Sequence, residues 1–109
     1  LEEFFAQPKN EKIVYTPNDY FTSQNGGGTN TWLVPDSQIQ NLEPIILTLP
    51  ENTESEERLP FSGEEFGYIL EGKVEIVTLK ECLKLKKGDC FSIDGHKQHK
   101  IKNIKSFLW

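Results

Sequence analysis

The two histidines of the chain, His96 and His99, lie three residues apart in the stretch GDCFSIDGHKQHKIKN, residues 88–103. Imidazole is a common transition-metal ligand and a common acid or base near neutral pH. Two imidazoles do not complete a metal site, because protein metal sites use three or four ligands. The stretch therefore predicts either half of a metal site or the remainder of a lost one.

Two further residues could take part in chemistry with these histidines. Glu65 lies in EFGYILEG, and a carboxylate beside an imidazole favours the charged state of both groups. Arg58 is the only arginine of the chain. It could bind a ligand carboxylate through two parallel hydrogen bonds, or it could pair at the surface with Glu56 or Glu57.

Length and composition limit the class of protein. A chain of 109 residues is long enough for one domain with a single core. No apolar run approaches the roughly 20 residues that span a bilayer, and no segment has the pattern of a signal peptide. Two cysteines, Cys82 and Cys90, are too few for a disulfide scaffold, and no CxxC motif supports a zinc ribbon. We expect a cytoplasmic protein whose two thiols are reduced, buried and inert.

Charge is unevenly distributed along the chain. The net charge is −5, yet residues 80–109 contain 8 of the 12 basic residues. A basic patch could bind nucleic acid, but these bases are all lysines without interleaved aromatic side chains. The alternation in KECLKLKKG and HKIKNIK favours the other interpretation, in which the lysines form the solvent-facing half of β-strands.

The secondary-structure signals are almost entirely β. The spacing in LEEFFAQ predicts a short helix that Pro8 ends, and no convincing helix follows. We expect a loop or a wide hairpin turn over 18–32, which contains the GGG run at 26–28, and a loop over 51–60. Strands are predicted near 11–17, 31–35, 43–51, 64–70, 73–79, 81–87, 90–93 and 99–109. This pattern predicts an all-β sandwich or barrel.

The order of motifs resembles that of the cupin family. Gly88, His99 and Asn103 match its second motif, and Glu65 and Gly72 match its first. Asp94 stands at the proline position of the second motif, and His96 stands at its second glycine position. The pair Asp94-Gly95 could still form the tight turn because glycine permits positive φ. The resemblance covers roughly residues 40–109 and implies a double-stranded β-helix, the cupin jelly roll.

The resemblance also implies a metal held by three imidazoles and a carboxylate, and here the sequence departs from the family. The first motif should carry a His-x-His pair shortly before Glu65, but this segment reads RLPFSGE. Either Leu59 and Phe61, or Arg58 and Pro60, occupy the histidine positions. Only Glu65 and His99 of the usual ligands are present, so we expect neither a metal nor another cofactor.

A narrower resemblance is to the C-terminal sensor domains of bacterial helix-turn-helix/cupin transcriptional regulators. It rests on GEEFGYILEGKVEI followed by LKKGDCFSIDGHKQHKIKN, in which Asp94 fits that subgroup. The resemblance implies that residues 1–10 end a preceding helix or linker and that residues 11–109 form the cupin domain. It also implies a small-molecule effector, a homodimer, and DNA contacts made only by an absent N-terminal domain.

Strand alternation indicates which side chains face the inside of the barrel. If Glu65 points inward, Gly67 and Ile69 do too, while Phe66 and Tyr68 point outward. Phe91 and Ile93 would line the same interior, and Ile101 would follow His99. The predicted ligand-binding residues are Arg58, Glu65, Phe91 and His99, with no catalytic residue.

An enzyme is the rival interpretation. A stand-alone small cupin could be an isomerase or a metal-dependent dioxygenase, with Glu65 and His99 as an acid/base pair. The missing histidines of the first motif argue against a metal-dependent reaction.

Overall fold

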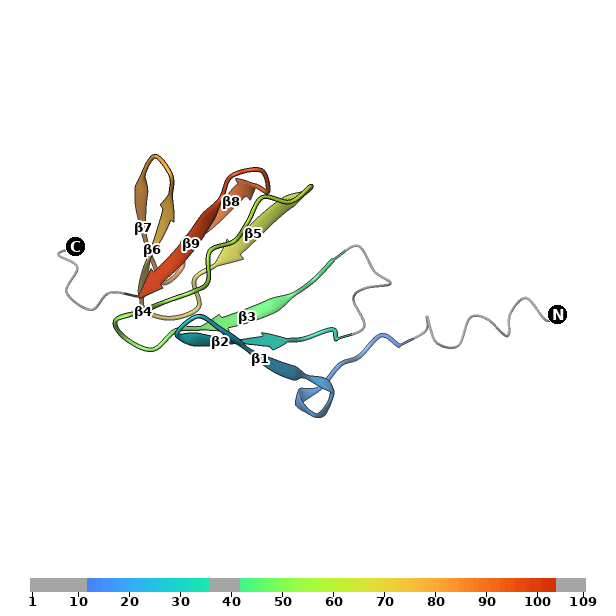
Figure 1. Cartoon of the computed structure of the whole chain (residues 1–109). Helices are drawn as coiled ribbons and strands as arrows, with labels where there is room; N and C mark the ends of the chain where they lie inside the picture. Colours follow the sequence, from blue (N-terminus) through green and yellow to red (C-terminus); the bar gives the residue numbers. More distant parts are fainter. Residues whose placement is uncertain (1–11, 36–41, 104–109) are drawn as a thin grey trace. The chain divides into compact units, whose positions relative to one another are not determined.

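The computed structural model of the chain describes residues 12–35 and 42–103 (Figure 1). The helix predicted within residues 1–7, the linker predicted over 1–10 and the end of the last predicted strand lie outside these residues. The described part is β apart from one 3-10 turn, η3 (Pro17–Asp19). Its strands are β1 (Phe21–Asn25), β2 (Gly28–Trp32), β3 (Ile45–Thr48), β4 (Thr53–Glu54), β5 (Glu64–Tyr68), β6 (Lys73–Thr78), β7 (Cys82–Lys86), β8 (Cys90–Asp94) and β9 (His99–Asn103).

The strands form three sheets in the all-β arrangement that the sequence predicts. Their orders are β1-β2-β3, β4-β9-β6-β7 and β5-β8. The chain divides into two compact units, one with residues up to 23 and 30–46 and the other with 24–29 and the residues from 47 on. The second unit contains both motifs identified in the sequence, so the description below concentrates on it. No helix among the described residues has the length and apolar character needed to cross a bilayer.

The prediction of a strand near 11–17 is wrong. Residues 12–16 form no strand, and Pro17 instead begins the 3-10 turn. The Asp19 carboxylate accepts a hydrogen bond from the Thr16 amide at 2.8 Å and an ion pair from Lys12 at 3.0 Å. These contacts lower the pKa of Asp19, with the backbone bond as the largest cause. The proline and this local capping end the extended pattern, and β1 begins only at Phe21.

The loop or wide hairpin turn predicted over 18–32 is wrong in its extent, because β1 and β2 lie within these residues and the triple glycine lies at the turn between them. Gly26 has φ of +61°, a conformation that favours glycine. Gly28 is buried, and a Cβ there would overlap the Thr48 carbonyl oxygen. The run is therefore explained by a close approach of two backbones as much as by the turn itself.

One face of the four-stranded sheet carries the apolar core of the second unit. Val74 pairs with Leu85, and Ile76 pairs with Ile101. Ile76 and Leu85 are the buried apolar side chains among the described residues. His99 pairs with Thr78 on the same face, so strand alternation directs its imidazole into this core.

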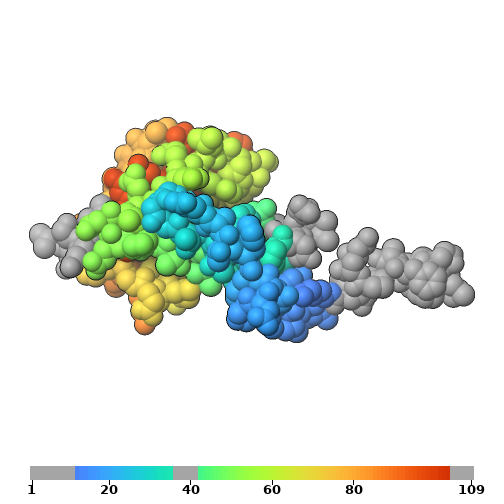
Figure 2. Space-filling model, turned by 60° about the horizontal axis from the view of Figure 1, so that its bottom comes forward, coloured from blue at the N-terminus to red at the C-terminus, as the bar shows by residue number. Residues whose placement is uncertain are grey.

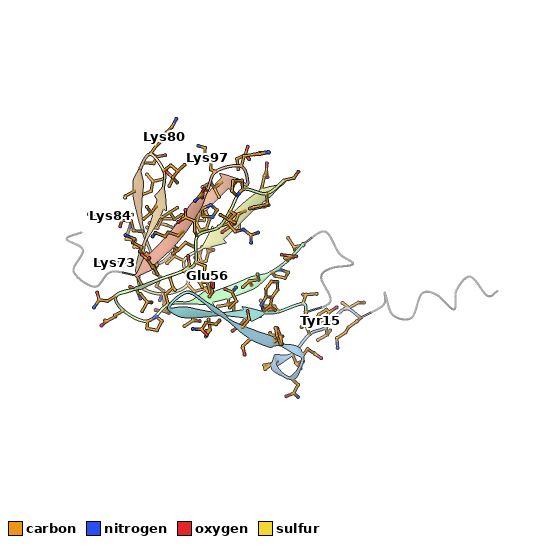
Figure 3. All side chains as sticks on the ribbon, in the orientation of Figure 1. Tyr15, Glu56, Lys73, Lys80, Lys84 and Lys97 are labelled. Atoms are coloured by element: carbon orange, nitrogen blue, oxygen red, sulfur yellow. The ribbon has the colours of Figure 1, made fainter. Side chains whose placement is uncertain are left out.

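The other face of this sheet carries the lysines. Glu75 lies opposite Lys84 on β7 and Lys102 on β9. Glu54 on β4 forms ion pairs with Lys100 at 3.1 Å and with Lys102 at 3.8 Å. Figure 3 labels the side chains of Lys73 and Lys84 on the β6–β7 hairpin. The prediction that the lysines form the outward half of alternating strands is confirmed for Lys84, Lys86, Lys100 and Lys102, whereas Lys105 lies outside the described residues.

The β5–β8 pair has one half-buried and one exposed face. Glu65 lies opposite Ile93 and Gly67 opposite Phe91 on the half-buried face. Figure 2 shows these distant parts of the sequence side by side, yellow-green beside orange and red. Phe66 and Tyr68 point outward as predicted and are exposed.

The prediction that both cysteines are buried is wrong, because Cys82 and Cys90 are exposed. Strand alternation places each of them on an outer face. Cys82 lies opposite Val77 on the lysine face, and Cys90 lies opposite Tyr68 on the outer face of β5–β8.

Candidate functional site

The segment from Asn52 to Arg58 follows β9 along its whole length. The Asn52 amide donates to the Asn103 carbonyl at 2.6 Å, and the Ser55 amide donates to the Ile101 carbonyl at 2.8 Å. The buried Ser55 hydroxyl accepts a hydrogen bond from the Ile101 amide at 2.9 Å. The predicted loop over 51–60 thus contains β4 and a backbone docked on the strand that carries His99.

Arg58 is fixed next to His99 by this docking. The two residues form an antiparallel bridge in which the Arg58 amide donates to the His99 carbonyl at 2.6 Å. The reciprocal bond from the His99 amide to the Arg58 carbonyl is 3.2 Å long. A preorganised backbone of this kind lowers the entropy cost of holding the guanidinium in place.

The Arg58 side chain pairs with Glu65 rather than with Glu56 or Glu57. Its Nε lies 3.7 Å from Glu65 Oε1. The guanidinium carbon lies 4.3 Å from the centroid of the Phe61 ring, which is a cation–π distance. The alternative of a pair with the neighbouring glutamates on the acidic segment is therefore wrong.

Glu65 and His99 are in direct contact. His99 Nε2 lies 3.1 Å from Glu65 Oε1, and His99 Nδ1 lies 2.8 Å from the Lys97 carbonyl oxygen. The His99 side chain is 1% exposed, whereas that of Glu65 is 28% exposed. Glu65 is therefore the member of the pair that an incoming molecule can reach. We call Arg58, Glu65 and His99 the charge cluster.

Gly95 holds Phe61 under the guanidinium. The Phe61 amide donates to the Gly95 carbonyl, and the Gly95 amide donates to the Gly63 carbonyl, each at 2.8 Å. A Cβ on Gly95 would lie 2.6 Å from the Phe61 carbonyl oxygen. Gly95 is absent from the glycines with positive φ, so the expected reason for a glycine here is wrong. The position requires close backbone approach instead.

Phe91, the fourth predicted ligand-binding residue, lies on the same face of β5–β8 as Glu65. Its ring covers Gly67, where a Cβ would overlap the ring atoms. The structure thus brings Arg58, Glu65 and His99 into contact and places Phe91 one register pair further along that face.

His96 is not part of the charge cluster. Its side chain is 76% exposed, and its Nδ1 lies 2.9 Å from Asp94 Oδ1. Asp94 also accepts a hydrogen bond from the His96 amide at 2.8 Å. The backbone bond, followed by the side-chain bond, lowers the pKa of Asp94. The two histidines that are close in sequence therefore have separate roles.

Three residues that support the site carry no ligand-like signal in the sequence. Ser55 lies in the segment 51–60 that reads as a polar loop, and Phe61 directly follows this segment. Asn103, which matches a motif position, donates from its side chain to the Leu49 carbonyl at 2.7 Å and fixes the end of β9. The motif match points to Asn103, and the alignment of Phe61 with a histidine position of the first motif points to Phe61, but no sequence signal distinguishes Ser55.

The donor set does not fit a metal of the kind that the family resemblance implies. No group of three or more His, Cys, Asp or Glu side chains that could hold an ion occurs within residues 12–35 and 42–103. Glu65 and His99 supply two donors, and the additional charged group beside Glu65 is the cation of Arg58 at 3.7 Å. A divalent ion would need at least one more anionic or neutral donor in that place.

Comparisons with known proteins agree with the motifs. No curated protein matches the chain significantly. The family model described as the cupin domain matches residues 45–107, which include Glu65, His99 and Asn103. This match covers more than half of the 109 residues, and the chain belongs to the cupin family.

Proposed function

We propose that the chain is the small-molecule-sensing domain of a bacterial transcriptional regulator that acts in the cytoplasm. Another part of the regulator would make the DNA contacts. The observation that carries this proposal is the charge cluster, in which Glu65 contacts His99 at 3.1 Å and Arg58 at 3.7 Å without a metal-binding set of ligands. Such a cluster beside apolar side chains is suited to orienting a ligand.

The apolar surroundings of the cluster support binding of an organic molecule. Phe61 stacks with Arg58, and Phe91 and Ile93 share the half-buried face of β5–β8 with Glu65. Small-molecule sites are usually lined by apolar side chains with a few polar groups among them. A ligand that binds one arrangement of the regulator better than another would shift its DNA affinity.

A thermal-shift screen of the full chain against amines, amino acids, organic acids and sugars tests the proposal. A ligand that binds only the folded state raises the melting temperature. The same compound should then change the affinity of the complete regulator for DNA fragments selected from its own genome. A screen without any stabilising compound would contradict the sensor function.

The homodimer is part of the same proposal. Phe66, Tyr68 and Leu70 are 70%, 56% and 54% exposed, and the first two lie on the outer face of β5. Apolar side chains exposed together on one strand are suited to a matching strand of a second copy.

An isomerase or a metal-dependent dioxygenase remains the alternative. The Glu65–His99 contact is compatible with proton transfer, but His99 is 1% exposed and would exchange protons with a substrate only through Glu65. Turnover by the purified chain that is lost in Glu65→Gln would support the enzyme and contradict the sensor.

A further inference from the structure

We propose that the charge cluster binds the carboxylate of a small organic acid and that Arg58 is the group that contacts it. This inference rests on the proposed sensor function and names the chemical class of its ligand. It decides between a cationic ligand, which Glu65 alone would favour, and an anionic one, which Arg58 would favour.

The proton positions on His99 follow from its two contacts. Nδ1 faces the Lys97 carbonyl oxygen at 2.8 Å, and a carbonyl oxygen can only accept, so Nδ1 carries a proton. Nε2 faces Glu65 Oε1 at 3.1 Å, and this contact also needs a proton between its two atoms. The pair is therefore either imidazolium with carboxylate or imidazole with carboxylic acid.

Both forms of this pair have zero net charge. Since Glu65 is compensated within the pair, the positive charge of Arg58 is left over, and the charge cluster as a whole carries +1. The nearby Glu64 and Asp94 lie opposite each other on the exposed face of β5–β8, on the other side from Glu65. Strand alternation thus keeps these two acids on the face that does not carry the cluster.

The Arg58 guanidinium is available to a ligand. Its side chain is 53% exposed, and its contact with Glu65 at 3.7 Å is longer than a hydrogen bond. Stacking on Phe61 uses a face of the guanidinium and leaves its N–H edge for a planar acceptor. Within the described residues the contacts of this side chain are those with Glu65 and Phe61.

A single excess positive charge matches a monoanion. A carboxylate can accept two parallel hydrogen bonds from the guanidinium edge, and its hydrocarbon part can lie against apolar side chains. A phosphate carries more charge and more acceptor oxygens than this cluster compensates. The cluster is therefore better suited to a carboxylate than to a phosphate.

The test compares three probes with the same carbon skeleton: 3-methylbutanoate, 3-methylbutylamine and 3-methylbutan-1-ol, with inorganic phosphate as a fourth. Because Arg58 is the only arginine, its Nε–H group gives a single NMR cross-peak in the ¹⁵N-labelled full chain. Titrations at pH 7 and constant ionic strength follow this peak and the backbone amides. The variants are Arg58→Gln and, as the matched control, Lys80→Gln at the exposed tip of the β6–β7 hairpin (Figure 3).

We expect 3-methylbutanoate to shift the Arg58 peak and to bind at least tenfold more tightly than the amine, the alcohol or phosphate. Arg58→Gln should weaken its binding at least tenfold, and Lys80→Gln less than twofold. Preference for the amine, tighter binding of phosphate, unchanged carboxylate binding in Arg58→Gln, or no binding of 3-methylbutanoate would each overturn the inference. The sensor function would survive these results if the broad thermal-shift screen still finds a ligand, and both proposals would fail if it finds none.

Discussion

Each of the two histidines contacts one carboxylate, and the two contacts differ in how deeply the histidine is buried. His99 is 1% exposed and contacts Glu65, whereas His96 is 76% exposed and contacts Asp94. The buried contact is shielded from solvent, so its removal would leave an uncompensated polar group. The exposed contact is screened by water, and its effect is to help lower the pKa of Asp94. Burial therefore separates His99 from the histidine three residues before it in the sequence.

Asp94 makes a pH-dependent contribution to stability. Its pKa is lowered in the folded chain, so the contribution is present above the ordinary aspartate pKa of about 3.9 and is lost as pH falls through the lower folded value. We expect Asp94→Asn to lower the melting temperature at pH 6 and to have a smaller effect at pH 3. Thermal unfolding across this range measures the difference.

The control for Asp94 is Glu81→Gln, which removes an exposed carboxylate from another turn. Its effect should not follow the pH profile of Asp94→Asn. Equal destabilisation by Asp94→Asn at pH 6 and pH 3 would show that the contact with His96 does not depend on the charge.

Two segments that connect strands hold the charge cluster in position. The stretch 52–58 is docked on β9, and the turn at Gly95 is docked on the segment that contains Phe61. The cluster forms because the stretch 52–58 places Arg58 beside His99, and the turn at Gly95 supports the Phe61 ring that packs against the Arg58 guanidinium. Strand β5 then supplies Glu65 opposite Ile93.

Ser55 is expected to be essential for the docking of the 52–58 segment. Its hydroxyl accepts from the Ile101 amide at 2.9 Å and donates to the Glu56 carbonyl at 3.1 Å. Ser55→Ala would leave that part-buried amide without its partner, which costs at most about 1–3 kcal/mol. Urea unfolding measures this loss, and the Arg58 Nε–H peak should shift. Ser92→Ala, on the exposed face of β8, is the control and should change neither quantity.

Gly95 is expected to resist substitution. In Gly95→Ala the new Cβ would be forced against the carbonyl oxygens of Phe61 and Gly63, at 2.6 and 2.7 Å. Because these are backbone atoms, we expect destabilisation of about 1–3 kcal/mol and displacement of the Phe61 ring. Urea unfolding gives the free energy. Lys97→Ala, at an exposed position of the same turn, should be nearly neutral; a neutral Gly95→Ala would contradict the close packing.

At the scale of the whole molecule, exposed apolar side chains predict association. Phe66 and Tyr68 alternate on the outer face of β5 beside Ser92 and Cys90 of β8. If two copies meet through this face, each covers the aromatic side chains of the other, and the symmetry of a dimer makes the contact self-complementary.

Phe66→Glu should therefore convert a dimer into a monomer. A charge introduced into a buried interface costs several kcal/mol without a partner, enough to weaken dimerisation by orders of magnitude. Sedimentation of the full chain gives the mass. Leu79→Glu introduces the same charge at a leucine that is 81% exposed, away from β5, and should leave the dimer intact. A monomeric parent chain, or a dimer in both variants, would refute this interface.

The all-β class, the cupin motifs with Glu65 and His99, and the alternation of the strands could be predicted from the sequence. These follow from periodic patterns and fixed motif spacings, which are local properties. The structure was needed to show that Arg58 joins Glu65 and not its neighbouring glutamates, that both cysteines are exposed, and that Gly95 is needed for close packing. Each of these depends on which backbone lies beside which, and a polar segment such as 52–58 shows no periodicity that reveals the strand on which it docks.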